Sequence, residues 1–171
     1  MPTHVALLRA INVGGTGKLP MAELRSLCER VGFTNVRTYI QSGNVVFTSR
    51  GSAARAKDTL EEVLEKRLGK PHAAILRSLA ELEAIEVTNP FPNAEPNRLL
   101  VVFLDSAPPK DAVKGWSVPG PESLALKGRE LFIHFPNGVG QSKLKIPFAD
   151  VGTGRNLNTV RALLEIARGS G

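Results

Sequence analysis

Apolar residues follow two different periods in the first half of the chain, and the period separates strands from helices. Apolar residues at helical spacing predict one helix over residues 20–31 and a second over 52–68. Short β-prone runs, typical of strands, occur at residues 4–11, 36–40, 44–49 and 73–77. The predicted order of residues 4–77 is therefore β-α-β-β-α-β, which is the order of the ferredoxin-like motif.

Residues that start and stop helices support these boundaries. Gly32 and Gly69 follow the last apolar residues of the two helices, as C-terminal glycines do. Ser52 is a suitable N-cap for the second helix. Ser78 and Glu81 have the spacing of a capping box, which predicts a third helix directly after the fourth strand.

The second half repeats the start of this order in a degenerate form. Strands are predicted over 99–104, 124–126 and 131–135, with a short helix over 108–116. A final helix follows, with Thr153 or Asn156 as its N-cap. No repeat of individual residues is visible between the halves. The order of elements predicts an α+β protein of two ferredoxin-like halves, residues 1–97 and 98–171, packed into one compact unit.

Composition narrows the class of protein without changing this fold. Of the 171 residues 42% are hydrophobic and 22% charged, which is ordinary for a folded globular chain and excludes a disordered or collagen-like one. No apolar run approaches the roughly 18 residues of a membrane helix, and no basic segment precedes the first strand. The single cysteine, Cys28, permits no internal disulfide. These features predict a cytoplasmic protein.

The net charge of +6 raises the question of nucleic-acid binding. The excess lies at the two ends of the chain, with a balance of +4 over residues 1–50, −2 over 51–97 and +4 over 98–171. No polybasic run occurs, and such a balance is common on ordinary protein surfaces. The charge therefore matters only where basic residues coincide with backbone suited to anions.

The glycine-rich loop before the first helix is one such place. Gly14, Gly15 and Lys18 lie between a strand and a helix N-terminus, where free N–H groups and the helix dipole favour anions. The loop is not a Walker A motif, because Asn12 and Leu19 replace two of its defining residues. It is predicted to bind an anion, or else its glycines only form a tight turn.

A second place is the start of the last helix. If Arg155 lies in the first helical turn, its charge opposes the helix dipole and needs a compensating group. That group is either a bound phosphate, which a guanidinium grips with two hydrogen bonds, or a carboxylate of the protein such as Asp150 or Glu130. Both interpretations remain open at this level.

Several segments resemble an uncharacterised bacterial family, domain of unknown function 1697. The resemblance is carried by residues 6–15 (ALLRAINVGG), 19–25 (LPMAELR), 36–47 (VRTYIQSGNVVF), 89–91 (NPF), 142–144 (SKL) and 153–159 (TGRNLNT). Leu157 stands where the family usually has Trp. The resemblance implies the same fold of two ferredoxin-like halves, and it implies no established activity, substrate or cofactor.

The polar residues within or beside these segments are mainly hydrogen-bond donors at the ends of predicted elements, where scaffolds present binding groups. These candidate ligand-binding residues are Arg9, Asn12, Gly14, Gly15, Lys18, Gln41, Ser42, Asn44, Ser142, Lys143, Arg155 and Asn156. They include no carboxylate, so neither a general base nor a hard-metal site is indicated. The three histidines lack metal-ligand spacing, and Cys28 lies on an apolar helix stripe.

These observations leave three functional hypotheses. The first is a protein that binds a small phosphate-bearing or other anionic ligand between the glycine loop and the start of the last helix, with or without catalysis. The second is a nucleic-acid-binding module, although only 5% of the residues are aromatic and able to stack on bases. The third is a structural or protein-interaction role. Neither a cofactor nor an oligomeric state is predicted.

Overall fold

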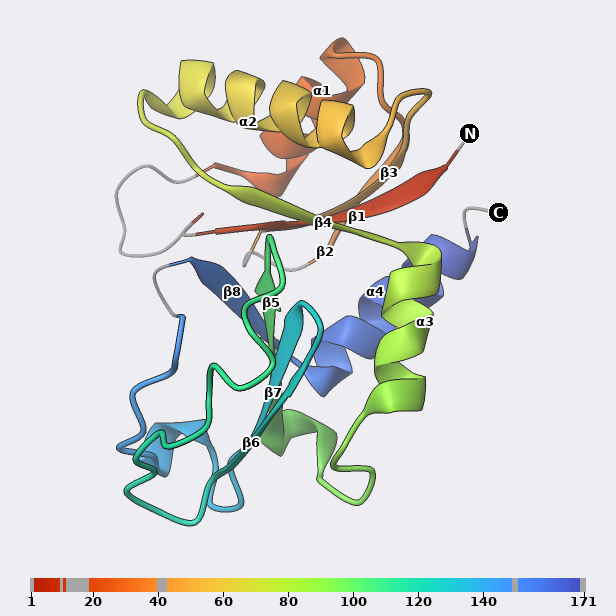
Figure 1. Cartoon of the computed structure of the whole chain (residues 1–171). Helices are drawn as coiled ribbons and strands as arrows, with labels where there is room; N and C mark the ends of the chain where they lie inside the picture. Colours follow the sequence, from red (N-terminus) through yellow and green to blue (C-terminus); the bar gives the residue numbers. More distant parts are fainter. Residues whose placement is uncertain (1, 10, 12–18, 40–42, 149–150, 170–171) are drawn as a thin grey trace. The chain divides into compact units, whose positions relative to one another are not determined.

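The computed structural model describes residues 2–9, 11, 19–39, 43–148 and 151–169. These residues form an α+β protein with two four-stranded antiparallel sheets and four α-helices (Figure 1). The chain divides into two compact units, residues 1–83 with 162–171 and residues 84–161. This division follows spatial proximity and does not test the domain boundary at residues 97 and 98, which stays a prediction.

The first unit contains the elements predicted for residues 4–77, in the predicted order. Its strands are β1 (Thr3–Leu8), β2 (Thr34–Tyr39), β3 (Asn44–Thr48) and β4 (Ala74–Ser78), and its sheet has the order β2-β3-β1-β4. Helix α1 (Met21–Arg30) follows β1, and α2 (Ala53–Leu68) follows β3. Every neighbouring pair of strands is antiparallel.

Both helices cover the same face of this sheet (Figure 1). On their apolar stripes, Leu24, Cys28 and Leu60 are fully buried against sheet residues such as Ala6 and Phe47. Periodicity alone indicated these stripes, and the burial of Cys28 confirms its assignment to the core.

The second unit contains the other sheet, in the order β6-β7-β5-β8. Its strands are β5 (Leu99–Leu104), β6 (Ser123–Lys127), β7 (Glu130–His134) and β8 (Gly152–Asn156). Two 3₁₀ turns, η1 (Pro96–Arg98) and η2 (Val139–Gln141), precede β5 and β8. Helices α3 (Leu79–Thr88) and α4 (Leu157–Gly169) each cross the division between the units.

Two expectations for the second half were wrong. Residues 108–116 form successive turns instead of a helix, with hydrogen bonds from the Ala112 N–H to Pro109 and from the Lys114 N–H to Asp111, and Gly115 takes the left-handed region at φ +78°. Residues 152–156 form a strand, so Arg155 precedes the last helix instead of lying in its first turn. This strand was not predicted because two of its residues are glycines, which are uncommon within strands. It pairs with β5 through the backbone.

Strand β4 lies at an edge of its sheet, and side chains occupy several of its outward backbone groups. Glu61 on α2 accepts a hydrogen bond from the Ala74 N–H at 2.9 Å, and Lys57 donates to the Ala74 carbonyl at 2.7 Å. Lys57 and Glu61 also pair with each other at 2.6 Å. Arg77, itself on β4, donates to the Leu76 carbonyl at 3.0 Å. Charged groups therefore cover much of this edge.

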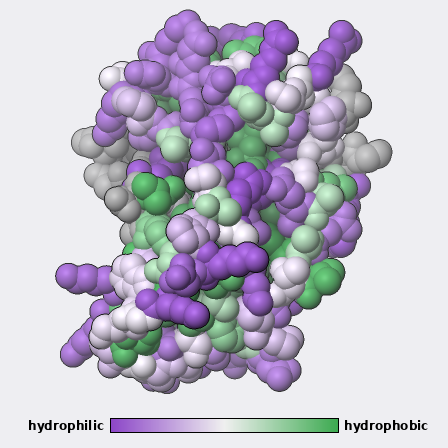
Figure 2. Space-filling view, in the orientation of Figure 1, coloured by the Kyte–Doolittle hydropathy of each residue, from purple (hydrophilic) through white to green (hydrophobic). Residues whose placement is uncertain are grey.

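Among the described helices, none is long and apolar enough to cross a membrane. Hydrophilic residues cover most of the face drawn in Figure 2, with hydrophobic ones showing between them. The exposed large hydrophobic residues of the described chain are Val87, Trp116, Val139 and Val151. The cytoplasmic location stays a prediction.

Candidate functional site

Half of the candidate residues chosen from the sequence lie outside the described residues. These are Asn12, Gly14, Gly15, Lys18, Gln41 and Ser42. The predicted anion-binding role of the glycine loop therefore stays a prediction.

Arg9 and Asn44 lie in the first unit, and the hydrogen bonds described for them are to the protein itself. The Arg9 N–H donates to the Ala73 carbonyl at 2.9 Å, which extends the pairing of β1 with β4. Asn44 is fully buried, and its Nδ2 donates to the Tyr39 carbonyl at 3.0 Å across the β2–β3 hairpin. These contacts stabilise the sheet and neither require nor exclude a ligand.

Ser142 and Lys143 lie in the second unit, in an irregular segment before β8. The Ser142 hydroxyl donates to Glu122 Oε1 at 2.5 Å and accepts from the Leu144 N–H at 3.0 Å. Lys143 is exposed. Ser142 thus connects two loops, and a carboxylate that sequence reasoning did not consider is its partner.

Arg155 and Asn156 also lie in the second unit, at the end of β8. Arg155 is 7% exposed, and its Nη1 donates to Thr153 Oγ1 at 2.6 Å and to the Gly154 carbonyl at 2.9 Å. Burial lowers the pKa of Arg155 to about 10, which leaves the guanidinium charged at neutral pH. Asn156 Oδ1 accepts from the Thr159 N–H at 2.9 Å, which confirms Asn156 as the N-cap of α4.

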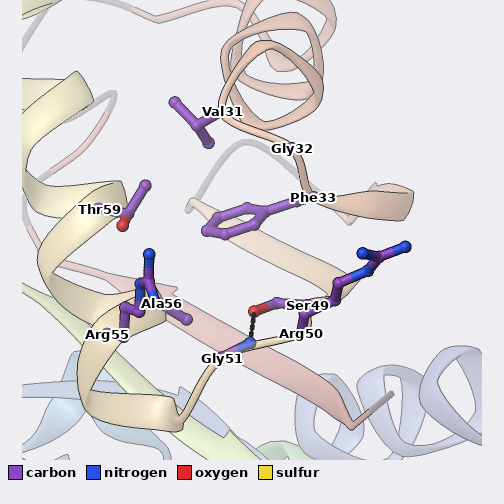
Figure 3. A pocket seen from close by; sticks show the side chains of 9 residues that line it. All are labelled: Val31, Gly32, Phe33, Ser49, Arg50, Gly51, Arg55, Ala56 and Thr59. Atoms are coloured by element: carbon purple, nitrogen blue, oxygen red, sulfur yellow. Dashed lines mark hydrogen bonds between the residues drawn. The ribbon is translucent and has the colours of Figure 1, made fainter.

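The largest hollow described for this chain lies in the first unit, at residues that the sequence did not single out. It has a volume of about 390 Å³ and is lined by Val31, Gly32, Phe33, Ser49, Arg50, Gly51, Arg55, Ala56 and Thr59 (Figure 3). These residues come from the end of α1, the β3–α2 turn and the first two turns of α2. The volume lies in the range of small-molecule sites.

The end of α1 positions the aromatic side chain of the hollow. Gly32 takes φ +97°, its N–H donates to the Glu29 carbonyl, and the Phe33 N–H donates to the Cys28 carbonyl. This is the Schellman pattern, which turns the residue after the glycine back toward the core. Phe33 then stacks on Phe47, with ring centroids 4.1 Å apart and planes within 8°. The apolar wall of the hollow is therefore held in place.

The opposite wall is formed by the start of α2. Ser52 caps the helix, with its side chain accepting from the Arg55 N–H at 3.1 Å, and Ser49 Oγ accepts from the Gly51 N–H at 3.2 Å. A Cβ at Gly51 would lie 3.1 Å from Cδ of Arg55, so the glycine leaves room for the arginine stem. Figure 3 shows the Arg55 side chain directed toward Thr59 and the Phe33 ring, and Arg50 directed away from them.

Arg55 has the electrostatic position that sequence reasoning assigned to Arg155. It is the third residue of α2, in a first turn that contains no acidic residue. Its guanidinium makes no ion pair or hydrogen bond within the described part of the chain. A cation at this end of a helix is unfavourable by a few tenths of a kcal/mol unless an anion accompanies it. The spacing of Ser52 and Arg55 was the sequence signal that could have identified this site.

Metal binding has no support in the described residues. No group of three His, Cys, Asp or Glu side chains among them is arranged to hold a metal ion. His4 and His72 are buried, His134 is half-buried, and Cys28 is buried in α1. Burial raises the pKa of the Cys28 thiol to about 12, so it is a poor nucleophile in the folded protein.

Comparisons with known proteins agree with the fold and the sequence resemblance. No curated protein matches the chain. The structure is similar to that of the conserved bacterial protein SP0830 from Streptococcus pneumoniae, with a TM-score of 0.79 and 28% sequence identity over 97% of this chain and 98% of that one. The model of the family described as "Protein of unknown function (DUF1697)" matches residues 1–132. Because that match covers most of the chain, the protein belongs to the DUF1697 family.

Proposed function

We propose that this protein binds a small ligand with an anionic group, and that the anion lies beside Arg55 in the hollow of the first unit. The observation that carries the proposal is the Arg55 guanidinium, which faces the hollow without an acidic partner in the described chain. A phosphate or carboxylate there would accept hydrogen bonds from the guanidinium and from first-turn N–H groups of α2.

The sequence-derived location for the same function is a second proposal. It places the anion beside the glycine loop, including Lys18, and beside Arg155. Its support is the buried, charged guanidinium of Arg155 next to the N-cap of α4. A single experiment separates the two locations.

That experiment is a titration of the full chain with inorganic phosphate at constant ionic strength, followed by the NMR shifts of the backbone amides. Arg55→Gln should weaken phosphate binding about tenfold, because a charge-assisted hydrogen bond is lost. Lys70→Gln is the matched control, since it removes the same charge from an exposed side chain of the same unit that does not line the hollow. It should weaken binding less than about twofold.

Three results would overturn the site at Arg55. They are an absence of shifts in the wild type, an equal loss in both variants, and a loss with Arg155→Gln in place of Arg55→Gln. The last result would support the sequence-derived location instead. Thermal unfolding of each variant shows whether the fold is retained.

The nucleic-acid alternative receives less support from the sheets. Of the four aromatic residues in the described strands, Phe47, Phe103 and Phe132 are fully buried, and Tyr39 on β2 is half-buried. Base stacking needs exposed rings, so the three phenylalanines are unsuited to it. Nucleic-acid binding would also weaken steeply with salt, in contrast to binding at a single arginine.

The strand order supports a finer assignment of the fold. Each sheet has the connectivity in which the first strand lies between the third and fourth strands of its half. Together with the β-α-β-β-α-β order, this supports a ferredoxin-like first half and a second half that has lost its two covering helices.

A further inference from the structure

We infer that the ligand of this site is an amphiphilic anion, whose apolar body lies in the groove between the end of α1 and helix α2. The inference rests on the proposed function, because it places the anionic group of the ligand at Arg55. It adds the chemical class of the remainder of the ligand.

The groove continues from the hollow. A second cavity of about 160 Å³ is lined by Val31, Thr59, Glu62, Val63 and Lys66. Val31 and Thr59 line both cavities, so the two spaces adjoin along α2. Arg55, Thr59 and Val63 recur every four residues and therefore share one side of the helix. Eight residues of helix separate Arg55 from Val63, a rise of about 12 Å.

Beyond Thr59, part of the wall of the groove is apolar. Val31 and Val63 are partly buried and pack against the core of the first unit. Farther along α2, Glu62 and Lys66 form an exposed ion pair at 3.1 Å, so their charges compensate each other. Arg55, which is exposed, has no such ion pair with any described residue, and the apolar side chains of Val31 and Val63 lie farther along the groove. This charge distribution fits a ligand with one anionic end and one apolar end.

The groove does not have to be assembled by the ligand. Arg67 near the end of α2 makes two hydrogen bonds to Glu23 on α1, one of them at 2.9 Å. The Arg67 guanidinium holds the pKa of the Glu23 carboxyl below its usual range. The two helices also share the same core cluster. Because both walls are fixed before binding, the cost of ordering them is small.

The test is a series of alkyl phosphates, from ethyl through butyl and hexyl to octyl phosphate. Affinity is measured calorimetrically on the full chain, below the concentration at which octyl phosphate forms micelles. Each added methylene should tighten binding by up to about fourfold, the factor expected from burial of one CH₂ group. The gain should stop once the alkyl chain reaches the end of the groove.

Variants of the groove test where the alkyl chain lies. Val63→Thr keeps the side-chain volume and should weaken octyl phosphate without changing ethyl phosphate. Thr59→Val should tighten octyl phosphate. Val87→Thr is the matched control, since Val87 is 85% exposed and does not line the groove.

Each outcome bears on one proposal. One outcome is that inorganic phosphate binds and needs Arg55, but affinity does not increase along the alkyl series. This outcome overturns the inference and leaves the proposed function intact. A gain that is the same in Val63→Thr as in the wild type also overturns it, because the alkyl chain then lies elsewhere. An absence of binding by every phosphate, inorganic phosphate included, overturns the proposed function itself.

Discussion

At the scale of single residues, His4 is a buried base without a hydrogen-bond partner among the described residues. Its side chain is 4% exposed on β1, and neither ring nitrogen makes a hydrogen bond with any described residue. Its closest ring neighbour is Phe47, 5.5 Å away between centroids. The imidazole therefore has an apolar environment that favours its neutral form, and burial lowers the pKa of His4 below the usual 6.5.

This burial predicts sensitivity to acid. The unfolded chain takes up a proton near pH 6.5, whereas folded His4 does so only at lower pH, so stability is complete above this range and decreases as the pH falls below it. One such proton contributes up to about 1.4 kcal/mol per pH unit. Urea unfolding between pH 8 and pH 5 should show a smaller decrease for His4→Leu than for the wild type. Parallel curves would show that His4 is not the source.

At the scale of elements, the first unit and the strands β5, β6 and β7 of the second unit followed from local signals, whereas strand β8 did not. The helix α1 has a regular apolar stripe, and Ser78 and Glu81 form the predicted capping box, with hydrogen bonds of 2.9 and 3.1 Å in the two directions. Strand β8 has the sequence GTGRN, which carries almost no β-propensity. Its pairing with β5, far away in the sequence, determines its conformation, and no local pattern contains that information.

For the candidate site, the sequence predicted the type of residue, a basic side chain near a helix N-terminus, but not its position. The criterion was a basic residue opposed to a helix dipole, and Arg155 does not meet it because it lies in β8, before the start of α4. Arg55 does meet this criterion once Ser52 is taken as the N-cap of α2. The sequence alone already indicates that cap. The aromatic wall was not predictable, because Phe33 meets Phe47 only when α1 and the sheet are packed together.

The turn after α1 supports a prediction about Gly32. Its φ of +97° is a conformation that L-residues with a Cβ rarely adopt, although no atom lies within 4 Å of an added Cβ. Gly32→Ala should therefore destabilise the protein by about 1 kcal/mol through backbone strain alone. The control is Gly140→Ala, which also has no neighbour within 4 Å and no positive φ. Chemical denaturation measures both variants, and equal stabilities would contradict the prediction.

At the scale of the whole molecule, the two sheets have the same register. The first residue of β1 pairs with the last of β3 (Thr3 with Thr48), and the first residue of β5 with the last of β7 (Leu99 with His134). The second residues of β1 and β5 pair with the last residues of β4 and β8. This agreement supports a duplication, which the order of elements suggested.

The correspondence extends to side chains. Arg77 and Arg155 are the fourth residues of β4 and β8, both are buried, and each donates from Nη1 to the carbonyl of the preceding residue. The next residues, Ser78 and Asn156, both cap the following helix. The two halves, which show no repeat of individual residues in the sequence, therefore have equivalent hydrogen bonds at these positions.

Equivalent caps should have equivalent energies. Ser78→Ala and Asn156→Ala each remove one side-chain acceptor from a helix N-terminus and should each cost about 1 kcal/mol of unfolding free energy. Ser26→Ala, on the exposed side of α1, removes a hydroxyl from a helix interior and should be neutral or slightly stabilising. Urea denaturation compares the three, and a cost confined to one cap would contradict the equivalence.

The covered edge of β4 has a consequence for crowded solutions. An open sheet edge is a template onto which the extended chain of another molecule can add, and such addition starts many aggregates. A foreign strand at β4 would have to displace Lys57 and Glu61 from both backbone groups of Ala74, and Arg77 from the carbonyl of Leu76. The backbone groups of Ala74 and Leu76 would then exchange hydrogen bonds with charged side chains for weaker ones with neutral backbone groups. The same side chains that join α2 to the sheet thus protect the folded protein against growth of the sheet from this side.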